Sequence, residues 1–540
     1  MEIPFFIKKL GHEIIAYILN ISNDNAKEVL ENNFKLDNSQ EQVLKEYINH
    51  LKTIKLNNID QDNSNFLILS YLGNLITENK EHIFNSYRKF CKGIIPSLTT
   101  DDIIEQLTYK LVIESYPFFL IKNNDDFSHN IGLPQTATSI FFSLPESKKL
   151  QEELIKDTIL KQLFSDGTNE MDTCIKFHSS AGGATSIQLG LLPSLIVTKI
   201  YELMVLKREV TLDNLEKYTK IIIKMYRELA INKKLKVSSF IGFENISIPS
   251  DTNIQGSYGC IKGYDKVFFE KIPQYLRPSL YNGNDNYLGF ILETNFDYEI
   301  ELDINLDENY KFPSKYHGKY DNINKIKDNL SLAFTLSNNE KVIGIKSRWI
   351  LIFNILSHGT SVSYSDRIRS NNITTYSQKE LENISEWYNI IHNANDSEIE
   401  IAIHRVLSAT SNRNNNLDSF IDSIIALENI FGHGSGEIGF KLSMGVAFLL
   451  KSNPDEIELL QKTVNNLYNN RSKVLHGAKK LSFEQEKEYM ETSLRIAIDC
   501  IKALYLQPEL LEDKNRGKTI IFNATHNKSL EEERVTPASV

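Results

Sequence analysis

Residues 467–477 read LYNNRSKVLHG, and this stretch decides how the C-terminal third of the chain is interpreted. The residues before it repeat apolar side chains at helical spacing. A glycine directly after such a pattern favours the left-handed backbone that ends a helix. The stretch therefore predicts the last turns of a helix, with Arg471 on its body, His476 on its final turn and Gly477 just beyond it.

The side chains of Arg471 and His476 could act together on an RNA phosphate. Five residues correspond to about 140° of rotation on a helix, so the pair can border one groove only if the helix end lies against a second surface. Histidine transfers protons near neutral pH, and the end of a helix favours its charged form. Arginine offers a planar, permanently charged fork to a phosphate. Arginine and histidine are also common near helix ends, so this spacing alone does not establish a function.

Helical periodicity surrounds this stretch from about Ser377 to Leu506. The connections contain Asn, Gly or Pro and are short, which is typical of antiparallel neighbours in a bundle. We therefore predict a C-terminal α-helical bundle over residues 376–506. Its helices are expected at Lys379–Ala394, Glu398–Thr410, Leu417–Phe431, Glu437–Leu450, Glu456–Leu475 and Phe483–Leu506.

The stretch from Ala402 to Gly477 resembles the Apea-like branch of the HEPN (higher eukaryotes and prokaryotes nucleotide-binding) superfamily. The matching segments are IHRV at 403–406, DSFID at 418–422, IALENIF at 425–431, EIGFKL at 437–442, LL at 449–450 and LYNNRSKVLHG at 467–477. Their order and spacing both match, and the pair of helices carrying ALE and RSKVLHG is more specific than the Arg–His spacing alone. The resemblance covers only this part of the 540 residues.

This resemblance implies a helical bundle that dimerises, so that two R-x4-H motifs face each other across a composite cleft. Many HEPN proteins are metal-independent ribonucleases of bacterial toxins and phage defence. By analogy, His476 is the acid/base and Arg471 binds the scissile phosphate, while Ser472 orients the substrate or His476. Lys473 adds positive charge.

Glu428 matches the acidic residue of the ALE helix in this family. We expect it to form a structural salt bridge with an arginine such as Arg405 or Arg413, rather than to act directly in catalysis. No cluster of carboxylates, histidines or cysteines has metal-ligand spacing in the sequence, so neither a metal nor another cofactor is expected.

The whole chain has the composition of a globular protein. Hydrophobic residues make up 41% and charged residues 24%, which excludes general disorder, and 540 residues divide into about three or four domains. The net charge of −10 means that contact with a nucleic acid must be local. The four cysteines are scattered, the N-terminus has no secretion signal, and apolar runs such as Trp349 to Leu356 are too short to cross a bilayer. These features predict a soluble, cytoplasmic protein without a membrane segment.

Residues 1–235 are predicted to be mostly helical. Three short helices within residues 1–55 (Leu10 to Leu19, one capped by Ser22, one capped by Ser39) loosely resemble helix-turn-helix modules, although a plain helical packing unit is the favoured interpretation. The glycines in AGGATS at 181–186 could approach a phosphate, but without a Gly-Lys-Ser/Thr ending the segment is better explained as a turn before a buried helix.

Residues 236–375 are predicted to form a β-rich middle domain, because β-branched and aromatic residues alternate between Gly and Asn clusters. His317 and His358 are isolated there, and no catalytic constellation is evident. From residue 507 to 540 the chain is polar and charged, which predicts a flexible tail. The expected fold class is therefore multidomain α+β.

The leading functional interpretation is an endoribonuclease that cleaves RNA as a homodimer or higher homo-oligomer. The long region before the bundle would sense a phage or nucleic-acid trigger, as suits a conditional toxin in abortive anti-phage defence. One alternative is a HEPN module that works as a silent dimerising or nucleotide-binding scaffold. Another is a DNA-associated regulator that binds through its N-terminal helices.

Overall fold

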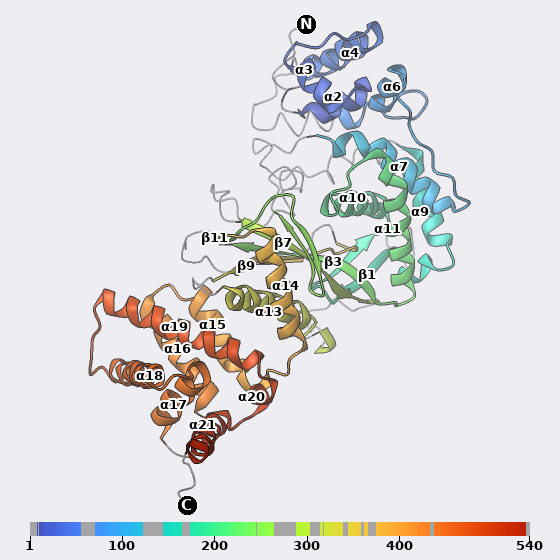
Figure 1. The fold of residues 1–540 in the computed structure, drawn as a ribbon. Helices are drawn as coiled ribbons and strands as arrows, with labels where there is room; N and C mark the ends of the chain where they lie inside the picture. Colours follow the sequence, from blue (N-terminus) through green and yellow to red (C-terminus); the bar gives the residue numbers. More distant parts are fainter. Residues whose placement is uncertain are drawn as a thin grey trace, which may run out of the picture.

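The computed structural model has a mixed α+β fold, with small sheets and a helical C-terminal region (Figure 1). His317, His358 and residues 433–436 lie outside the residues that the structure describes. The described residues are 8, 10–55, 71–121, 144–164, 173–244, 246–263, 288–302, 314–316, 318–338, 344–357, 361–364, 374–432 and 437–535.

The first 55 residues contain the three expected helices, α2 (His12–Leu19), α3 (Asn23–Leu30) and α4 (Asn38–Lys55). The hydroxyl of Ser22 caps α3 by accepting a hydrogen bond from the backbone N–H of Asn25. The predicted cap at Ser39 is wrong, because Asp37 Oδ1 accepts the N–H of Gln40 at 2.8 Å. Residues 14–19 of α2 are all buried, so this helix is a packing element; the DNA-binding role stays a prediction.

A second group of helices follows, and a β-hairpin interrupts it. The turn predicted at Gly182 and Gly183 joins the two strands of this hairpin, and both glycines have positive φ, 98° and 84°. The buried helix that the sequence predicted after this turn is present, but the second strand of the hairpin and a short 3-10 turn, which were not predicted, come before it. These elements are α6 (Ile83–Phe90), α7 (Ile103–Phe119), α9 (Pro145–Lys156), η2 (Leu160–Leu163), β1 (Cys174–Ser179), β2 (Ala184–Gln188), η3 (Leu189–Leu191), α10 (Leu192–Leu206), η4 (Leu212–Asn214) and α11 (Leu215–Ala230).

Helix α10 is apolar enough to cross a membrane by length and composition, over Leu189–Leu206 with its preceding turn. This apolar run is longer than the run from Trp349 to Leu356. However, 89% of this window is buried inside the fold. Its two charged residues, Lys199 and Glu202, are also fully buried and neutralise each other, with Nζ 2.5 Å from Oε2. Such burial is typical of a core helix.

The centre of the molecule is a six-stranded sheet in the order β10-β9-β3-β7-β6-β5, in which every neighbouring pair is antiparallel. The pairing of β3 with β7 runs from Leu235 opposite Tyr298 to Glu244 opposite Leu288. The strands of the six-stranded sheet are β3 (Leu235–Glu244), β5 (Asn253–Gly256), β6 (Gly259–Gly263), β7 (Leu288–Tyr298), β9 (Lys346–Ile352) and β10 (Ser361–Tyr364). Strand β8 (Ile300–Leu302) pairs with β1, and β4 (Ile246–Ser247) pairs in parallel with β11 (Thr374–Thr375).

Helix α13 (Asp321–Ser337), preceded by η5 (Ser314–Tyr316), lies between this sheet and the C-terminal helices (Figure 1). Phe334 of α13 stacks on Phe290 of β7, with ring centroids 5.4 Å apart. The C-terminal helices are joined to the same layer, because Ser411 Oγ donates a hydrogen bond to the carbonyl of Ile345. Buried apolar side chains from Leu10 to Ile520 form one continuous cluster. The domain boundaries proposed at residues 235 and 375 therefore stay predictions.

All six helices predicted between residues 376 and 506 are present, with ends within two residues of the expected positions. Capping explains where several of them begin. Ser377 and Ser482 form capping boxes with Glu380 and Gln485, and the side chain of Asn453 accepts the N–H of Asp455. The helices are α14 (Gln378–Asn393), α15 (Glu400–Ser411), α16 (Asn416–Phe431), α17 (Ile438–Leu450), α18 (Pro454–Leu475) and α19 (Phe483–Tyr505), with η6 (Ser397–Ile399) before α15.

The segment from residue 508 differs from the flexible tail that the sequence predicted, because it forms α20 (Pro508–Glu512) and α21 (Arg516–Val535). Arg516 is fully buried and donates hydrogen bonds to the carbonyls of Leu510, Leu511 and Ile430. Gly517 lies so close to α16 that an added Cβ would stand 2.7 Å from the carbonyl oxygen of Phe431. A buried arginine and a glycine anchor this segment, and neither gives the apolar periodicity by which helices are recognised.

Candidate active site

The end of α18 has the geometry that the sequence predicted. The helix ends at Leu475, His476 is its C-cap, and Gly477 has a φ of 68°. The N–H of Gly477 donates to the carbonyl of Val474 at 3.0 Å, and that of Ala478 to the carbonyl of Lys473 at 2.8 Å. These two bonds form a Schellman motif, which satisfies the last helical carbonyls and holds His476 at the helix end.

The guanidinium of Arg471 faces the neighbouring helix α16. Its Nη2 lies 3.2 Å from Oε2 of Glu428, and the two side chains are 20% and 23% exposed. Burial raises the pKa of Glu428 above its usual range, and the charge of Arg471 opposes part of this rise. The ion pair thus fixes the direction in which Arg471 points from α18.

Glu428 forms a salt bridge with an arginine, as the sequence predicted, but its partner is Arg471 and not Arg405 or Arg413. Both arginines contact Asp422, whose carboxylate is 3% exposed: Arg405 Nη1 lies 2.8 Å from Oδ1 and Arg413 Nε 2.5 Å from Oδ2. Asp422 lies among buried residues of α16 such as Phe420 and Ile424. The sequence analysis did not single out Asp422; the signal that could have found it is an acidic residue within the run of α16 that is otherwise rich in apolar residues.

Arg471 keeps hydrogen-bonding capacity beyond its contact with Glu428. Its Nε is buried and has no hydrogen-bond partner within the part of the chain that the structure describes. Buried donors without partners are rare in folded proteins because desolvation costs about 1–3 kcal/mol for each. Such an atom at the candidate site is consistent with an arginine whose full set of contacts requires a ligand or a second protein surface.

His476 and Lys473 are exposed, and Ser472 is half-buried. The carbonyl of Ser472 accepts the backbone N–H of His476, so the predicted supporting residue belongs to the helix turn that holds the histidine. Arg471 is therefore half-buried against α16, whereas His476 faces solvent at the helix end.

The loop after Gly477 is tied back onto the helix. Lys479 Nζ donates to Oδ1 of Asn470 at 2.7 Å and lies 5.8 Å from the centre of the Tyr489 ring. Asn470 is itself buried. This contact holds a second positive charge beside the turn that precedes Arg471.

Exposed apolar side chains lie on the segments that adjoin the pair. Leu475 is 50% exposed beside His476, and Phe483, which begins α19, is 64% exposed. Ile438 and Phe440 at the start of α17 are exposed too. That part of α17 lies against α18, because a Cβ on Gly439 would stand 3.3 Å from the ring of Tyr468.

Three cavities of about 520, 460 and 380 Å³ lie in the N-terminal and middle parts of the described chain, and neither Arg471 nor His476 lines them. Within the described ranges, no group of three His, Cys, Asp or Glu side chains is arranged to hold a metal ion. The candidate site of one chain thus consists of an arginine on a carboxylate and a solvent-facing histidine.

Comparison of the chain with models of known families, with curated proteins and with solved structures finds no significant match.

Proposed function

We propose that this protein is a HEPN-type endoribonuclease that cleaves RNA without a metal ion, at a site built from two copies of the chain. The observation that carries the proposal is the arrangement of α18. Glu428 directs Arg471, and the Schellman turn presents His476 to solvent one turn further along.

The chemistry requires a base, an acid and a cation. Neutral His476 accepts the proton of a ribose 2′-hydroxyl, and the resulting oxygen attacks the adjacent phosphorus. The bond from phosphorus to the 5′-oxygen breaks, and a protonated histidine donates a proton to that oxygen. The products are a 2′,3′-cyclic phosphate and a 5′-hydroxyl, so atoms and charge balance. Arg471 stabilises the negative charge that develops on the phosphate.

A second copy of the chain supplies what one copy lacks. One histidine cannot be both the base and the acid in the same step, and the His476 of a second copy can provide the other role. The exposed side chains of Leu475, Phe483 and Phe440 adjoin the site and would be covered by dimerisation. Lys473, Lys479 and Lys480 place positive charge near the helix end of a protein whose net charge is −10.

Glu428 acts as a positioning residue in this proposal. A phosphate competes with the carboxylate for the guanidinium, and the single 3.2 Å contact leaves other N–H groups of Arg471 for the substrate. An amide at this position would keep the shape of the side chain but lose its charge. The Glu428→Gln variant should therefore bind RNA with a changed KM, whereas loss of His476 should abolish kcat.

The experiment is degradation of single-stranded RNA by the purified full-length protein in EDTA. Wild type should produce fragments, and Arg471→Ala and His476→Ala should not. Lys462→Ala is the matched control, because this exposed lysine lies on the same helix in an ion pair with Glu458. Activity that survives either site variant would support the alternative of a HEPN dimerisation or nucleotide-binding scaffold.

The biological role follows from the same analogy. A large region in front of a small nuclease suits a conditional toxin that acts in the cytoplasm after a phage or nucleic-acid trigger. The four cysteines are free and buried in the fold, which is compatible with a reducing compartment. Growth arrest on expression should disappear with His476→Ala.

A further inference from the structure

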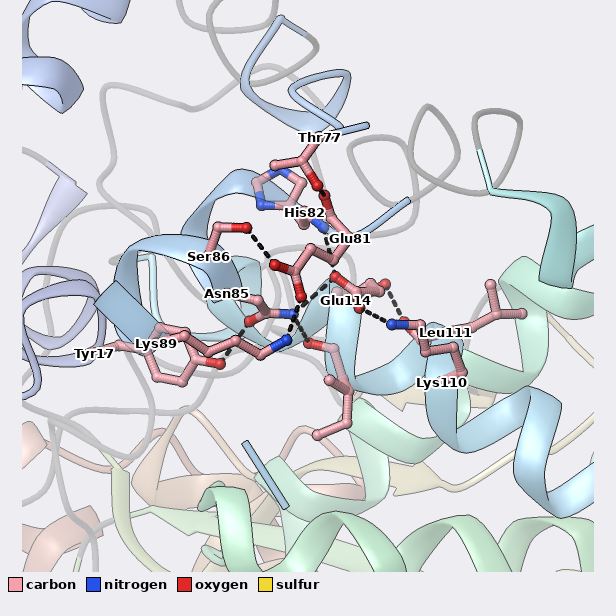
Figure 2. Close-up of polar contacts among 12 residues, drawn as sticks. Tyr17, Thr77, Glu81, His82, Asn85, Ser86, Lys89, Lys110, Leu111 and Glu114 are labelled. Carbon is pink, nitrogen blue, oxygen red and sulfur yellow. Dashed lines mark hydrogen bonds and ion pairs between the residues drawn. The ribbon is translucent and has the colours of Figure 1, made fainter. Parts of the chain in front are cut away.

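Buried polar side chains join α2, α6 and α7, and they satisfy one another (Figure 2). Oε2 of Glu114 accepts hydrogen bonds from the backbone N–H of His82 at 2.6 Å and from the amide of Asn85 at 2.8 Å. Lys110 donates to Oε1 of the same carboxylate at 2.5 Å, and the hydroxyl of Tyr17 donates to Oδ1 of Asn85 at 2.6 Å. A buried network that is filled from within needs no ligand, because burial is costly for polar groups that lack partners.

Strand β2 (Ala184–Gln188) differs, because it lies at the outer edge of the three-stranded sheet β2-β1-β8. The N–H of Ser179 donates to the carbonyl of Gly183, and the N–H of Leu189 donates to the carbonyl of Thr173. Both pairs continue the register of β1 with β2. Because hydrogen-bonded pairs alternate along an antiparallel ladder, the odd-numbered residues of β2 are the ones that bond to β1.

The even-numbered residues Ala184, Ser186 and Gln188 therefore turn their backbone groups away from β1. Their N–H groups have no hydrogen-bond partner among the residues that the structure describes. Ala184 and Ser186 also have outward carbonyls, whereas the carbonyl of Gln188 begins the 3-10 turn that follows. These groups repeat every about 6.8 Å along the strand. The object that matches such a row of donors and acceptors is another extended strand.

Strand β2 lacks the features by which proteins protect an edge strand from pairing. Such features are charged side chains, proline, bulges and very short strands. The five residues of β2, ATSIQ, contain no charge and no proline, and their register with β1 has no bulge. The other edge of the same sheet, β8, has three residues, and its Glu301 forms an ion pair with Lys315 at 2.6 Å. One edge of this sheet is thus protected and the other is open.

The sequence of β2 is compatible with pairing to itself. An antiparallel pair centred on Ser186 places this residue opposite Ser186 of a second copy, and Ala184 opposite Gln188. The two serines then exchange both of their backbone hydrogen bonds, and the N–H of each Gln188 donates to the carbonyl of Ala184. The side chains of Ser186 and Gln188 are exposed and uncharged, so no like charges face each other across the pair.

The nearest charge on the sheet also permits this pairing. Lys176 of β1 is exposed and lies opposite Ser186. In the proposed pair, the lysines of the two copies would be three strand spacings apart, about 14 Å, which exceeds the Debye length of about 8 Å at physiological salt. Their repulsion is therefore screened. A polyanion would find only this one lysine along the edge, so an uncharged strand is the better match.

We propose that β2 pairs with β2 of a second copy of the chain, forming one continuous sheet across two chains. This contact is distinct from the ribonuclease site, because β1 lies apart from α18 in Figure 1, with the central sheet between them. If the contact near His476 forms too, each chain has two different two-fold contacts. Such chains build rings or filaments rather than stopping at a dimer. Only this larger assembly rests on the proposed function.

The test is sedimentation velocity of the full-length protein that carries His476→Ala and Leu475→Asp, so that neither RNA cleavage nor the contact near His476 decides the result. This parent protein should self-associate. Ser186→Lys should weaken its association by about tenfold or more, because two lysines then face each other at the centre of the pair. Ser186→Ala is the matched control, since it keeps the backbone and should associate like the parent.

A charge exchange tests the two-fold geometry. A fluorescently labelled Ser186→Lys chain should sediment as a monomer alone and as a dimer after mixing with a Ser186→Glu chain, because opposite charges then face each other. A labelled chain that stays monomeric in the mixture would overturn the pairing centred on Ser186. A parent protein that stays monomeric, or equal association in Ser186→Lys and Ser186→Ala, would overturn the proposal as a whole.

Ser186→Pro provides a variant that acts on the backbone alone. It removes the central N–H, and an edge position whose N–H faces solvent tolerates proline, so the midpoint of thermal unfolding should stay near that of the parent. Hydrogen exchange of residues 184–188 should slow with rising protein concentration in the parent and not in Ser186→Pro. Exchange that is slow at every concentration would assign the edge to another segment of the same chain and would contradict the proposal.

Discussion

Nη2 of Arg471 lies 3.2 Å from Oε2 of Glu428, across the contact between α18 and α16. This ion pair joins the two segments whose sequences carry the HEPN resemblance, the ALE helix and the RSKVLHG helix. It is the salt bridge with an arginine that was expected of Glu428, made with a different arginine from the two that were named. The acidic residue directs the candidate phosphate-binding arginine, and the more buried Asp422 holds the arginines that were expected to be its partners.

The first prediction separates charge from geometry at Arg471. Arg471→Lys keeps a positive charge but loses the planar fork, so kcat/KM for single-stranded RNA should fall by about 10- to 100-fold, equivalent to about 1.4–3 kcal/mol. The kcat/KM of the Arg471→Ala variant should be lower still. Steady-state kinetics with a short RNA measure kcat/KM for both variants. Equal activity in Arg471→Lys and wild type would show that a point charge suffices and that the fork has no role.

The second prediction concerns the exposed apolar side chains next to His476. Leu475→Asp and Phe483→Asp should weaken self-association and reduce RNA cleavage, with little change in unfolding, because both side chains are at least half exposed. Leu459→Asp is the control: it is 68% exposed on the other end of the same helix. Sedimentation velocity across a concentration series measures the association. Self-association that is unchanged in both variants would place the interface elsewhere.

The third prediction concerns Asp422, which joins α15 to α16. Asp422→Asn should lower the free energy of unfolding by about 2–3 kcal/mol, because a buried carboxylate loses two ion pairs whose arginines are still partly solvated. Urea denaturation followed by far-UV circular dichroism measures this. The exposed pair of Glu458 and Lys462 is the control, and Glu458→Gln should leave the denaturation midpoint in place. A similar denaturation midpoint for both variants would contradict the claim that the ion pairs of Asp422 stabilise the packing of α15 on α16.

The fourth prediction is a pH dependence that comes from His82. Burial lowers the pKa of this histidine to about 4, although its hydrogen bond with the carbonyl of Leu72 opposes the shift. The unfolded chain therefore binds more protons between about pH 6.5 and pH 4, and the stabilising contribution of His82 is present above pH 6.5 and is lost as the pH falls toward 4. Between pH 7 and pH 5 the loss is about 2 kcal/mol.

The His82 contribution is measured as a difference between variants, because other groups also titrate. The drop in unfolding free energy from pH 7 to pH 5 should be smaller in His82→Gln than in wild type. His404→Gln, at an exposed histidine of α15, should keep the wild-type drop. If His82→Gln loses as much stability on acidification as wild type, the histidine is already protonated in the folded state or is not buried.

The fifth prediction tests the anchoring of α21. Arg516→Ala removes three hydrogen bonds to main-chain carbonyls and leaves buried acceptors without a donor, so the unfolding free energy should fall by about 3 kcal/mol or more. Lys518→Ala, at an exposed position two residues further on, should be close to wild type. Because α21 packs on the end of α16, the same variant should increase hydrogen exchange around Glu428. Unchanged hydrogen exchange around Glu428 would show that the anchoring of α21 does not stabilise the candidate site.

Much of the local structure could be predicted from the sequence, because local signals determine it. Ser377 and Ser482 cap helices through their own side chains, and Gly477 adopts the positive φ that ends α18. The contacts that orient the site are long-range, and no spacing rule assigns them. By sequence alone Arg405, Arg413 or Arg471 could have paired with Glu428, and only the packing of α16 on α18 selects Arg471.

The C-terminal segment also depends on long-range contacts that cannot be assigned from the sequence. Residues 507–540 read as polar, and Arg516 is the kind of residue that usually lies on the surface. Its burial depends on the carbonyls of Ile430, Leu510 and Leu511, which come together only in the fold. The open edge of β2 was equally invisible, since long-range pairing decides which strand of a sheet is outermost.

The most direct test of the central claim is the chemistry of RNA ends in cells that express the protein. Wild type should stop growth and yield RNA fragments with 2′,3′-cyclic phosphate and 5′-hydroxyl termini, detected by ligation methods selective for each end. His476→Ala and Arg471→Ala, expressed at equal levels, should yield neither the arrest nor the fragments. Fragments with 3′-hydroxyl termini, or the same fragments from the His476→Ala variant, would contradict catalysis by the Arg471–His476 pair.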